Sequence, residues 1–273
     1  MGLAIPFEIG QVFTNNQGDK GVIIEFKKGT KFIHRRATVE FEDGTQIYVS
    51  TTKLSSGSWK NPNKPVVCGV GYIGIGNFNT LHKGVSSRAY VKWNSMLRRC
   101  YAVGSEEYIG YGDSGVTVCE EWHSFQNFAE WFYKKDTFSA KLELDKDLKS
   151  PDGFTGKIYS PSTCCLITSK VNNMMAAIDT VTVRKSNVKG VKSWNISDSH
   201  RVYYCSKDKE LVDLFLSEFK LKRLLEIRRQ LERSSYVEQE TTEAVDLKIY
   251  RFTKDVVLKD KLLFLDKIRP EGL

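Results

Sequence analysis

Apolar and polar residues alternate along three stretches near the start of the chain. The alternation runs through residues 21–28, 37–41 and 47–49, and this period of two predicts short, half-buried strands. Between the second and third stretches, Asp43-Gly44 predicts the tight turn of a hairpin. Short strands joined by tight turns predict a small β-barrel module over residues 1–65.

A helical period follows in the middle of the chain. Residues 88–101 carry apolar side chains three or four positions apart, which predicts an amphipathic helix with a core-facing stripe of Ala89, Trp93, Met96, Leu97, Cys100 and Tyr101. Residues 116–118 predict a short strand, and Ser124 predicts the N-cap of a second helix. That helix has its own apolar stripe of Phe125, Phe128, Ala129 and Phe132.

Residues 142–173 predict two strands, a turn and the start of a helix. The stretch 142–145 alternates as a half-buried strand does, and Ser-Pro-Asp-Gly at 150–153 supplies turn residues. Residues 158–159 resume the apolar run, so we expect them to form a hairpin with the first strand. Ser169 predicts the N-cap of the helix that follows.

The pattern changes again after residue 179. Residues 180–184 and 200–205 alternate as strands do, and Ser206 predicts the N-cap of a long helix with a broad apolar side. In the tail, residues 236–273, the first part alternates like a strand and the second predicts a short helix. Two roles for the tail stay open: docking on the body of the protein, or binding a protein partner such as a second copy of the chain.

The Pro/Gly-rich residues 61–77 predict the first boundary between modules. They contain a G-x-G-x-x-G spacing that neither follows a strand nor opens a helix, which argues for a tight, ordered linker and against a nucleotide-binding loop. The patterns together predict an α+β fold with a β-barrel module (1–65), a central domain (66–178), a sheet-plus-helix module (179–235) and a tail (236–273).

Charge is distributed unevenly over these modules. The net charge is +8 and the pI is about 9.0, which permits a polyanionic partner. The balance of Lys and Arg over Asp and Glu is +3 in residues 1–65, +1 in 66–178, +5 in 179–235 and −1 in the tail. Flanking modules that hold DNA show such a distribution, and so do many ordinary basic surfaces.

Two groups of cations are candidate phosphate contacts. The first surrounds one loop of the N-terminal module and could equally be a solvated hairpin tip: Lys27, Lys28, Lys31, His34, Arg35 and Arg36. The second lies off the apolar stripe of the helix at 88–101: Lys92, Arg98 and Arg99.

The composition of the chain indicates in which compartment the protein works and whether it binds structural zinc. No run approaches the roughly 18 apolar residues of a membrane-spanning helix, and the start of the chain lacks the features of a signal peptide. Six cysteines in 273 residues do not form the pattern of a disulfide framework, so we expect a reducing cytoplasm and no membrane association. Cys100, Cys119 and Cys164, with His123 or Cys165, are scattered singly, and this spacing argues against a structural zinc site.

The hairpin and helix predicted at 142–173 resemble the ββα-metal finger of HNH-type nucleases. The resemblance implies that Asp145, at the end of the first strand, and Asn172, on the helix, hold one Mg²⁺ ion against the scissile phosphate. The family's general-base histidine falls on Lys146, and a lysine in the open stays protonated near neutral pH. Two outcomes are open: Asp147 or a distant His activates water, or Lys146 replaces the cation and pairs with Asp145.

Four short motifs in order resemble a phage-encoded family of HNH-like proteins: RCY at 99–101, VCEEW at 118–122, LDKD at 144–147 and YSPSTC at 159–164. The resemblance implies a small β-module at the N-terminus, the cytoplasm of a bacterial host, and a C-terminal module similar to ethylene-response-factor domains. Such a domain reads double-stranded DNA with its sheet, and the corresponding residues are Arg184, Lys185, Lys189, Lys192, Trp194 and Arg201. A packing sheet with solvated lysines is the alternative.

Three functions follow from these observations. The first is a Mg²⁺-dependent endonuclease that nicks or cuts double-stranded DNA. The second is a DNA-binding protein of the same ancestry in which cleavage is weak or lost. The third is a phage protein that acts on a host or phage protein. Because Lys146 stands where the general base belongs, we favour the second.

Overall fold

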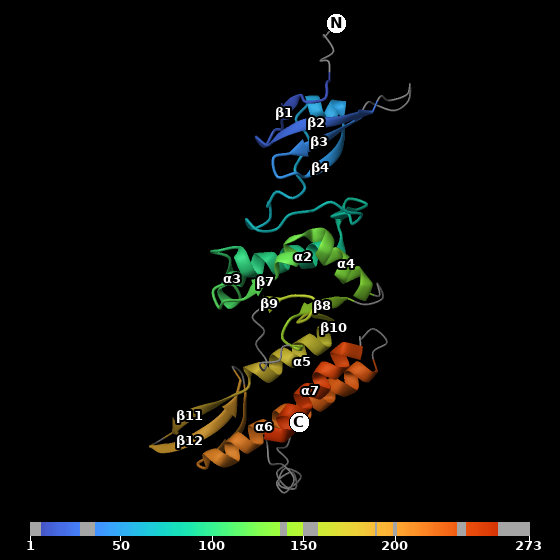
Figure 1. Cartoon of the computed structure of the whole chain (residues 1–273). Coiled ribbons are helices and arrows are strands. Elements are labelled where there is room, and N and C mark those ends of the chain that lie inside the picture. Colours follow the sequence, from blue (N-terminus) through green and yellow to red (C-terminus); the bar gives the residue numbers. More distant parts are fainter. Residues whose placement is uncertain are drawn as a thin grey trace.

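The computed structural model describes residues 7–27, 36–136, 141–149, 158–188, 190–198, 201–233 and 239–255. Within them the chain is mixed α+β, with seven α-helices and several small sheets, so the predicted class is confirmed (Figure 1). None of the described helices combines the length and apolarity that crossing a membrane requires.

The N-terminal strands form an open sheet. β1 (Val12–Thr14), β2 (Lys20–Lys27), β3 (Arg36–Phe41) and β4 (Gln46–Ser50) pair antiparallel in chain order, and in the described residues the two outer strands do not pair with each other. The predicted closed barrel is therefore wrong. After β4 the chain enters α1 (Thr51–Ser55), whose buried Leu54 joins Trp59 over the apolar side of the sheet, so the core is covered without closure.

The linker after this sheet is ordered, as predicted. Asn61 Nδ2 donates to Asp43 Oδ2 at 2.8 Å, and Lys64 Nζ pairs with Asp19 Oδ1 at 2.5 Å. These contacts hold the start of the linker against turns of the N-terminal sheet. The domain boundary itself stays a prediction.

Close packing explains why position 71 of the linker is a glycine. A Cβ atom at this position would lie 2.3 Å from Leu97 Cδ1 and 3.0 Å from Trp93 Cζ2. Only glycine therefore lets the linker backbone approach the central helix this closely. The G-x-G-x-x-G spacing thus has a structural role here.

The central core is built on α2 (Arg88–Tyr101), whose bounds match the predicted helix. α2 packs with α4 (Phe125–Lys135), which begins at the predicted N-cap Ser124. The fully buried Trp93 donates from Nε1 to the carbonyl of Trp122 at 2.7 Å, within the short 3₁₀ helix at Glu120–His123. Smaller elements border this core: β5 (Leu81–His82), β6 (Val85–Ser86) and α3 (Glu106–Gly110).

The predicted hairpin at 142–159 is wrong in its second strand. β8 (Leu142–Asp145) pairs antiparallel with β10 (Cys165–Thr168), whereas β9 (Ile158–Tyr159) pairs in parallel with β7 (Thr117–Val118). The reason is burial: the first three residues of β10 form a continuous apolar run at most 1% exposed, as a strand buried on both faces does, whereas Ile158 of β9 is exposed. The helix α5 (Ser169–Thr180) follows β10 directly, so the order strand, strand, helix is preserved.

The C-terminal elements form a sheet and two helices. β11 (Thr182–Val188), β12 (Val191–Ser197) and β13 (Val202–Ser206) pair antiparallel, and α6 (Lys209–Glu232) packs on them. The N-caps of α5 and α6 are Thr168 and Asp208, not the predicted Ser169 and Ser206.

The tail corrects another expectation. Residues 239–255 form the helix α7 (Gln239–Asp255) rather than a strand, and they dock on α6. Thr241, Val245 and Lys248 are buried at a spacing of four and three residues, which is the period of a helix face. Residues 256–273 and the turn at 150–153 lie outside the described residues.

We expect Gly71→Ala to lower the free energy of unfolding by about 1–3 kcal/mol, because the added methyl group overpacks the contact with Leu97 and Trp93. Gly110→Ala is the matched control, since a Cβ atom there meets nothing within 4 Å, and it should change stability by less than about 0.5 kcal/mol. Urea denaturation followed by tryptophan fluorescence measures both. Equal stability of the two variants would contradict this packing argument.

Candidate functional site

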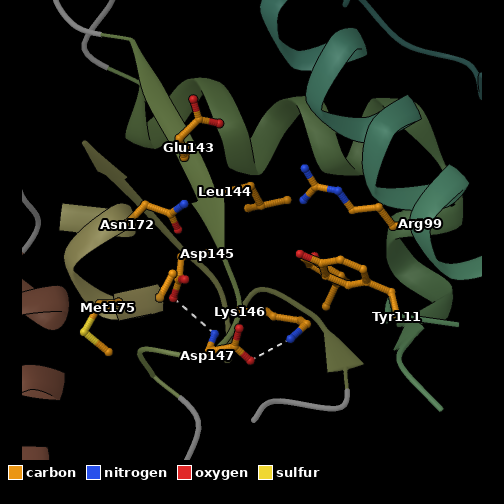
Figure 2. A pocket seen from close by; sticks show the side chains of 11 residues that line it. Arg99, Tyr111, Glu143, Leu144, Asp145, Lys146, Asp147, Asn172 and Met175 are labelled. Carbon is orange, nitrogen blue, oxygen red and sulfur yellow. Dashed lines mark hydrogen bonds and ion pairs between the residues drawn. The ribbon is translucent and has the colours of Figure 1, made fainter. Parts of the chain in front are cut away.

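A small pocket lies where α2, β8, β9 and α5 meet (Figure 2). Its volume is about 190 Å³, below the roughly 300–1,000 Å³ typical of pockets for drug-sized ligands. The lining brings together residues that are far apart in sequence: Arg99, Tyr111, Glu143, Leu144, Asp145, Lys146, Asp147, Tyr159, Asn172, Met175 and Ala176. All four residues predicted to be catalytic are among them.

Asp145 is a buried carboxylate at the end of β8. Its Oδ1 accepts hydrogen bonds from the backbone N–H groups of Asp147 at 3.1 Å and Leu148 at 2.7 Å. Burial raises the pKa of this carboxyl above its usual value, although the hydrogen bond from Leu148 acts in the opposite direction. The turn after β8 therefore depends on Asp145 as its acceptor.

Lys146 makes a different ion pair from the one predicted. Its side chain is 8% exposed, and its Nζ donates to Asp147 Oδ1 at 2.6 Å rather than to Asp145. The ammonium group also lies 5.5 Å from the ring centre of Tyr111 and 5.9 Å from that of Tyr159. Backbone donors engage Asp145 Oδ1, and the ammonium group of Lys146 pairs with the other neighbouring carboxylate.

Arg99 contributes a second cation from α2. Its guanidinium carbon lies 5.3 Å from the ring centre of Tyr111, so both cations contact the same ring. Burial lowers the pKa of Arg99, but the Tyr159 hydroxyl, Tyr111 and the charge of Glu143 together outweigh that effect and the pKa is raised overall. Burial likewise raises the pKa of Tyr159, so the phenol stays protonated. No carboxylate of the described residues forms an ion pair with Arg99.

Glu143 already has its own partners at the border of the pocket. Lys92 Nζ donates to Glu143 Oε2 at 2.5 Å, and Ser169 Oγ donates to Oε1 at 3.2 Å. Burial opposes ionisation of Glu143, but the hydrogen bond and charge of Lys92 outweigh it and hold the pKa below its usual value. Lys92 is therefore a structural ion-pair partner, and its predicted role as a DNA contact competes with this pairing.

Asn172 lies on α5 with its amide directed into the pocket beside Asp145 (Figure 2). The two residues predicted to bind Mg²⁺ therefore do share one site. Mg²⁺ demands near-octahedral oxygen ligands and ionised carboxylates. The pocket instead pairs a carboxyl of raised pKa with two neighbouring side-chain cations, and one carboxyl oxygen already accepts two backbone bonds. Glu143, Asp147 and the amide of Asn172 place further oxygens in the same lining, so the Mg²⁺ site stays a prediction.

The cysteines considered for zinc are buried thiols. Burial raises the pKa of Cys100 to about 11 and that of Cys164 to about 12, whereas zinc binds the thiolate. In the part of the chain that the structure describes, no three His, Cys, Asp or Glu residues gather as a metal-binding group. The expectation about zinc stays a prediction.

The predicted N-terminal and central cations lie on different elements. Arg36, on β3, lies over the Tyr48 ring at 5.4 Å, and Arg98 is exposed on α2. The side chain of Lys27 is not described. Lys28, Lys31, His34 and Arg35 lie outside the described residues.

The predicted C-terminal recognition residues are divided between the two faces of their sheet. Lys185 pairs across strands with Trp194, so both side chains lie on one face, and Arg184 lies on the opposite face. By the same alternation Lys192 lies on the face that carries Trp194. Trp194 packs into the core against α6. Arg201 stands beside Tyr203, 5.6 Å from its ring centre, and Lys189 lies outside the described residues.

Sequence reasoning assigned no role to three residues that shape the pocket: Tyr111, Glu143 and Tyr159. Glu143 carried a usable signal, because it alternates with Asp145 along a predicted strand and so faces the same side. Tyr111 reaches the pocket through a loop after α3, and nothing in its local pattern indicates this. Comparison of the chain with protein-family models, curated proteins and solved structures found no match.

We expect Asp145→Ala to lower the free energy of unfolding by about 1–3 kcal/mol, because the N–H groups of Asp147 and Leu148 lose their acceptor. Asp145→Asn keeps an acceptor oxygen and removes a buried charge, so it should be at least as stable as the unaltered chain at pH 7. The folded-state pKa of Asp145 is raised above the ordinary value of 3.8, so the ionised form is the costly one. As pH falls through the folded pKa toward 3.8, the unaltered chain should gain stability relative to Asp145→Asn.

Urea denaturation across pH 4–7 measures these differences. An Asp145→Asn variant as unstable as Asp145→Ala at pH 7 would show that the ionised carboxylate is needed for folding.

Proposed function

We propose that this chain is a double-stranded-DNA-binding protein of HNH-nuclease ancestry in which metal-dependent cleavage is weak or lost. The observation that carries the proposal is the Lys146–Asp147 ion pair at the position of the general base. It lies in a strand–strand–helix unit, β8–β10–α5, whose Asp145 and Asn172 share one pocket.

The chemistry of Lys146 supports the loss of cleavage. A general base must accept a proton from water, and an ammonium group that donates to a carboxylate has no lone pair to offer. The ammonium group also lies over the rings of Tyr111 and Tyr159, whose faces attract a cation. Asp147, the alternative base, is engaged by the same ion pair.

Charge supports the DNA-binding part of the proposal. The modules on either side of the central domain carry the net positive charge, and Arg184, Lys185 and Lys192 are exposed on the C-terminal sheet. Because Lys185 and Lys192 lie on the opposite face from Arg184, a duplex that lies flat on one face would meet only part of this set. Arg184 and Lys185 lie on the edge strand β11, and Lys192 lies on the central strand β12, so a duplex that approaches along β11 would meet the first two directly.

We expect double-stranded DNA binding that depends little on sequence and falls steeply with salt. If about four to six phosphates are neutralised, the slope of log K against log salt should be roughly −4 to −5. Combined substitution of Arg184, Lys185, Lys189 and Lys192 by Ala should flatten the slope. Fluorescence anisotropy with a labelled duplex measures it.

Lys134→Ala is the control for that experiment, because Lys134 is an exposed cation on α4 paired with Glu130 and lies outside the C-terminal module. It should leave the slope unchanged. DNA binding that ignores salt, or that survives the fourfold substitution with its slope intact, would contradict the assignment of this sheet.

Lys146→His is the test of the lost cleavage, since it restores the Asp-His pair that the resemblance implies. We expect the unaltered chain to nick supercoiled plasmid slowly or not at all in Mg²⁺ or Mn²⁺. If the frame is otherwise intact, Lys146→His should gain nicking that EDTA abolishes, and the double variant with Asp145→Ala should lose it. Efficient nicking by the unaltered protein, lost in Asp145→Ala alone, would establish an active enzyme instead.

A further inference from the structure

The pocket lining contains a cation, Arg99, that forms no ion pair among the described residues. Each carboxylate in the lining has donors: Glu143 has Lys92 and Ser169, Asp147 has Lys146, and Asp145 has two backbone N–H groups. Arg99 is half-buried beside the Tyr111 ring and the Tyr159 hydroxyl, and Glu143 contributes to it only through its charge. A phosphate oxygen would give this guanidinium the direct ion pair that no described side chain supplies.

Side chains around Arg99 leave its guanidinium pointing into the space between α2 and α5. Figure 2 shows Arg99 on one side of the pocket and Asn172 on the other, with Lys146 below them. The guanidinium fork matches two oxygens of a phosphate group, and the ammonium of Lys146 and the amide of Asn172 add further donors. The pocket volume of about 190 Å³ suits one such group rather than a whole nucleotide.

We infer that this pocket is a metal-independent phosphate site, in which Arg99 and Lys146 supply the positive charge that a magnesium ion supplies in the nuclease frame. The ligand is a phosphate group, either a backbone phosphate of DNA or free phosphate. The DNA form of the inference rests on the proposed function, whereas the free-phosphate form stands without it.

Asp145 separates this inference from a metal site. A metal-dependent site needs the ionised Asp145 carboxylate as a ligand, so Asp145→Asn would weaken phosphate binding there. In a site built on side-chain cations, the same carboxylate repels the phosphate across the pocket. Removing its charge should therefore leave phosphate binding equal or stronger, with the same hydrogen-bond acceptor still present for Asp147 and Leu148.

The test is calorimetric titration of the full chain with inorganic phosphate in the presence of EDTA, with chloride at matched ionic strength as the blank. We expect saturable binding that Arg99→Gln weakens about ten- to a hundredfold, because a charged hydrogen-bonded fork is lost. Arg99→Lys keeps the charge without the fork, so its phosphate affinity should lie between those of the unaltered chain and Arg99→Gln. This intermediate value would show that the loss in the glutamine variant is not caused by misfolding. Arg98→Gln removes the same charge from the exposed neighbour and should change phosphate affinity less than twofold.

A second arm distinguishes the sources of phosphate. If the ligand is the DNA backbone, inorganic phosphate competes with a short duplex more strongly than chloride does at equal ionic strength, and Arg99→Gln weakens the duplex more than Arg98→Gln does. If the ligand is free phosphate, Arg99→Gln weakens the binding of inorganic phosphate and leaves duplex binding unchanged.

The inference is overturned if phosphate binds no better than chloride, if binding needs Mg²⁺, or if Asp145→Asn abolishes it. Equal effects of Arg99→Gln and Arg98→Gln on phosphate also overturn it. In each of these cases normal, salt-dependent duplex binding would leave the proposed function intact. If the chain binds phosphate saturably but binds no duplex, the proposed function is contradicted and the phosphate site in the pocket still stands.

Discussion

The hydrogen bond from Trp93 Nε1 to the carbonyl of Trp122 fixes the rotation of α2, and the rest of the central domain depends on that rotation. Both tryptophans are fully buried, so losing this hydrogen bond would leave a buried N–H group and a buried carbonyl group unsatisfied. With Trp93 facing the aromatic core, residues 92 and 99 lie about two turns apart on the side that faces β8. There Lys92 meets Glu143 and Arg99 enters the pocket. The same tryptophan leaves room in the linker only for Gly71. The buried side chain of Trp93 thus contacts the linker at Gly71 and sets the side of α2 from which Arg99 enters the pocket.

The balance of charge in the pocket follows from the order in which its groups find partners. Backbone donors engage Asp145, Lys146 then pairs with Asp147, and Lys92 pairs with Glu143. Arg99 lies beside the Tyr111 ring, the Tyr159 hydroxyl and the charge of Glu143, and it forms no ion pair among the described residues. A histidine at position 146 would remove the ammonium group that pairs with Asp147. Lysine therefore places a second fixed cation beside Arg99 in the pocket lining.

Sequence patterns predicted the elements whose apolar periodicity lies within one continuous segment of the chain. The stripe of α2 gave its bounds, and the strand before Asp145 and the helix carrying Asn172 were found because their periods differ clearly. The pairing of β8 with β10 was missed because β9 has two residues, and its parallel partner β7 is some forty positions away, beyond any local signal. The N-terminal barrel was overpredicted, since strand patterns do not report whether a helix covers the open face. Arg98 and Arg99 look alike in sequence, and only the rotation of α2 separates a solvated charge from one in the pocket.

The helix α6 links the pocket to the C-terminal sheet. Its first half buries Val212, Phe215 and Phe219 against β12 and β13, and its second half buries Leu224, Ile227 and Leu231 against α5 and α7. α5 carries Asn172, so the sheet and the pocket are joined through one continuous helix of 24 residues, roughly 36 Å long, and not through a flexible linker. A substitution that loosens α5 from α6 would therefore change how the sheet and the pocket are joined without altering a residue of either.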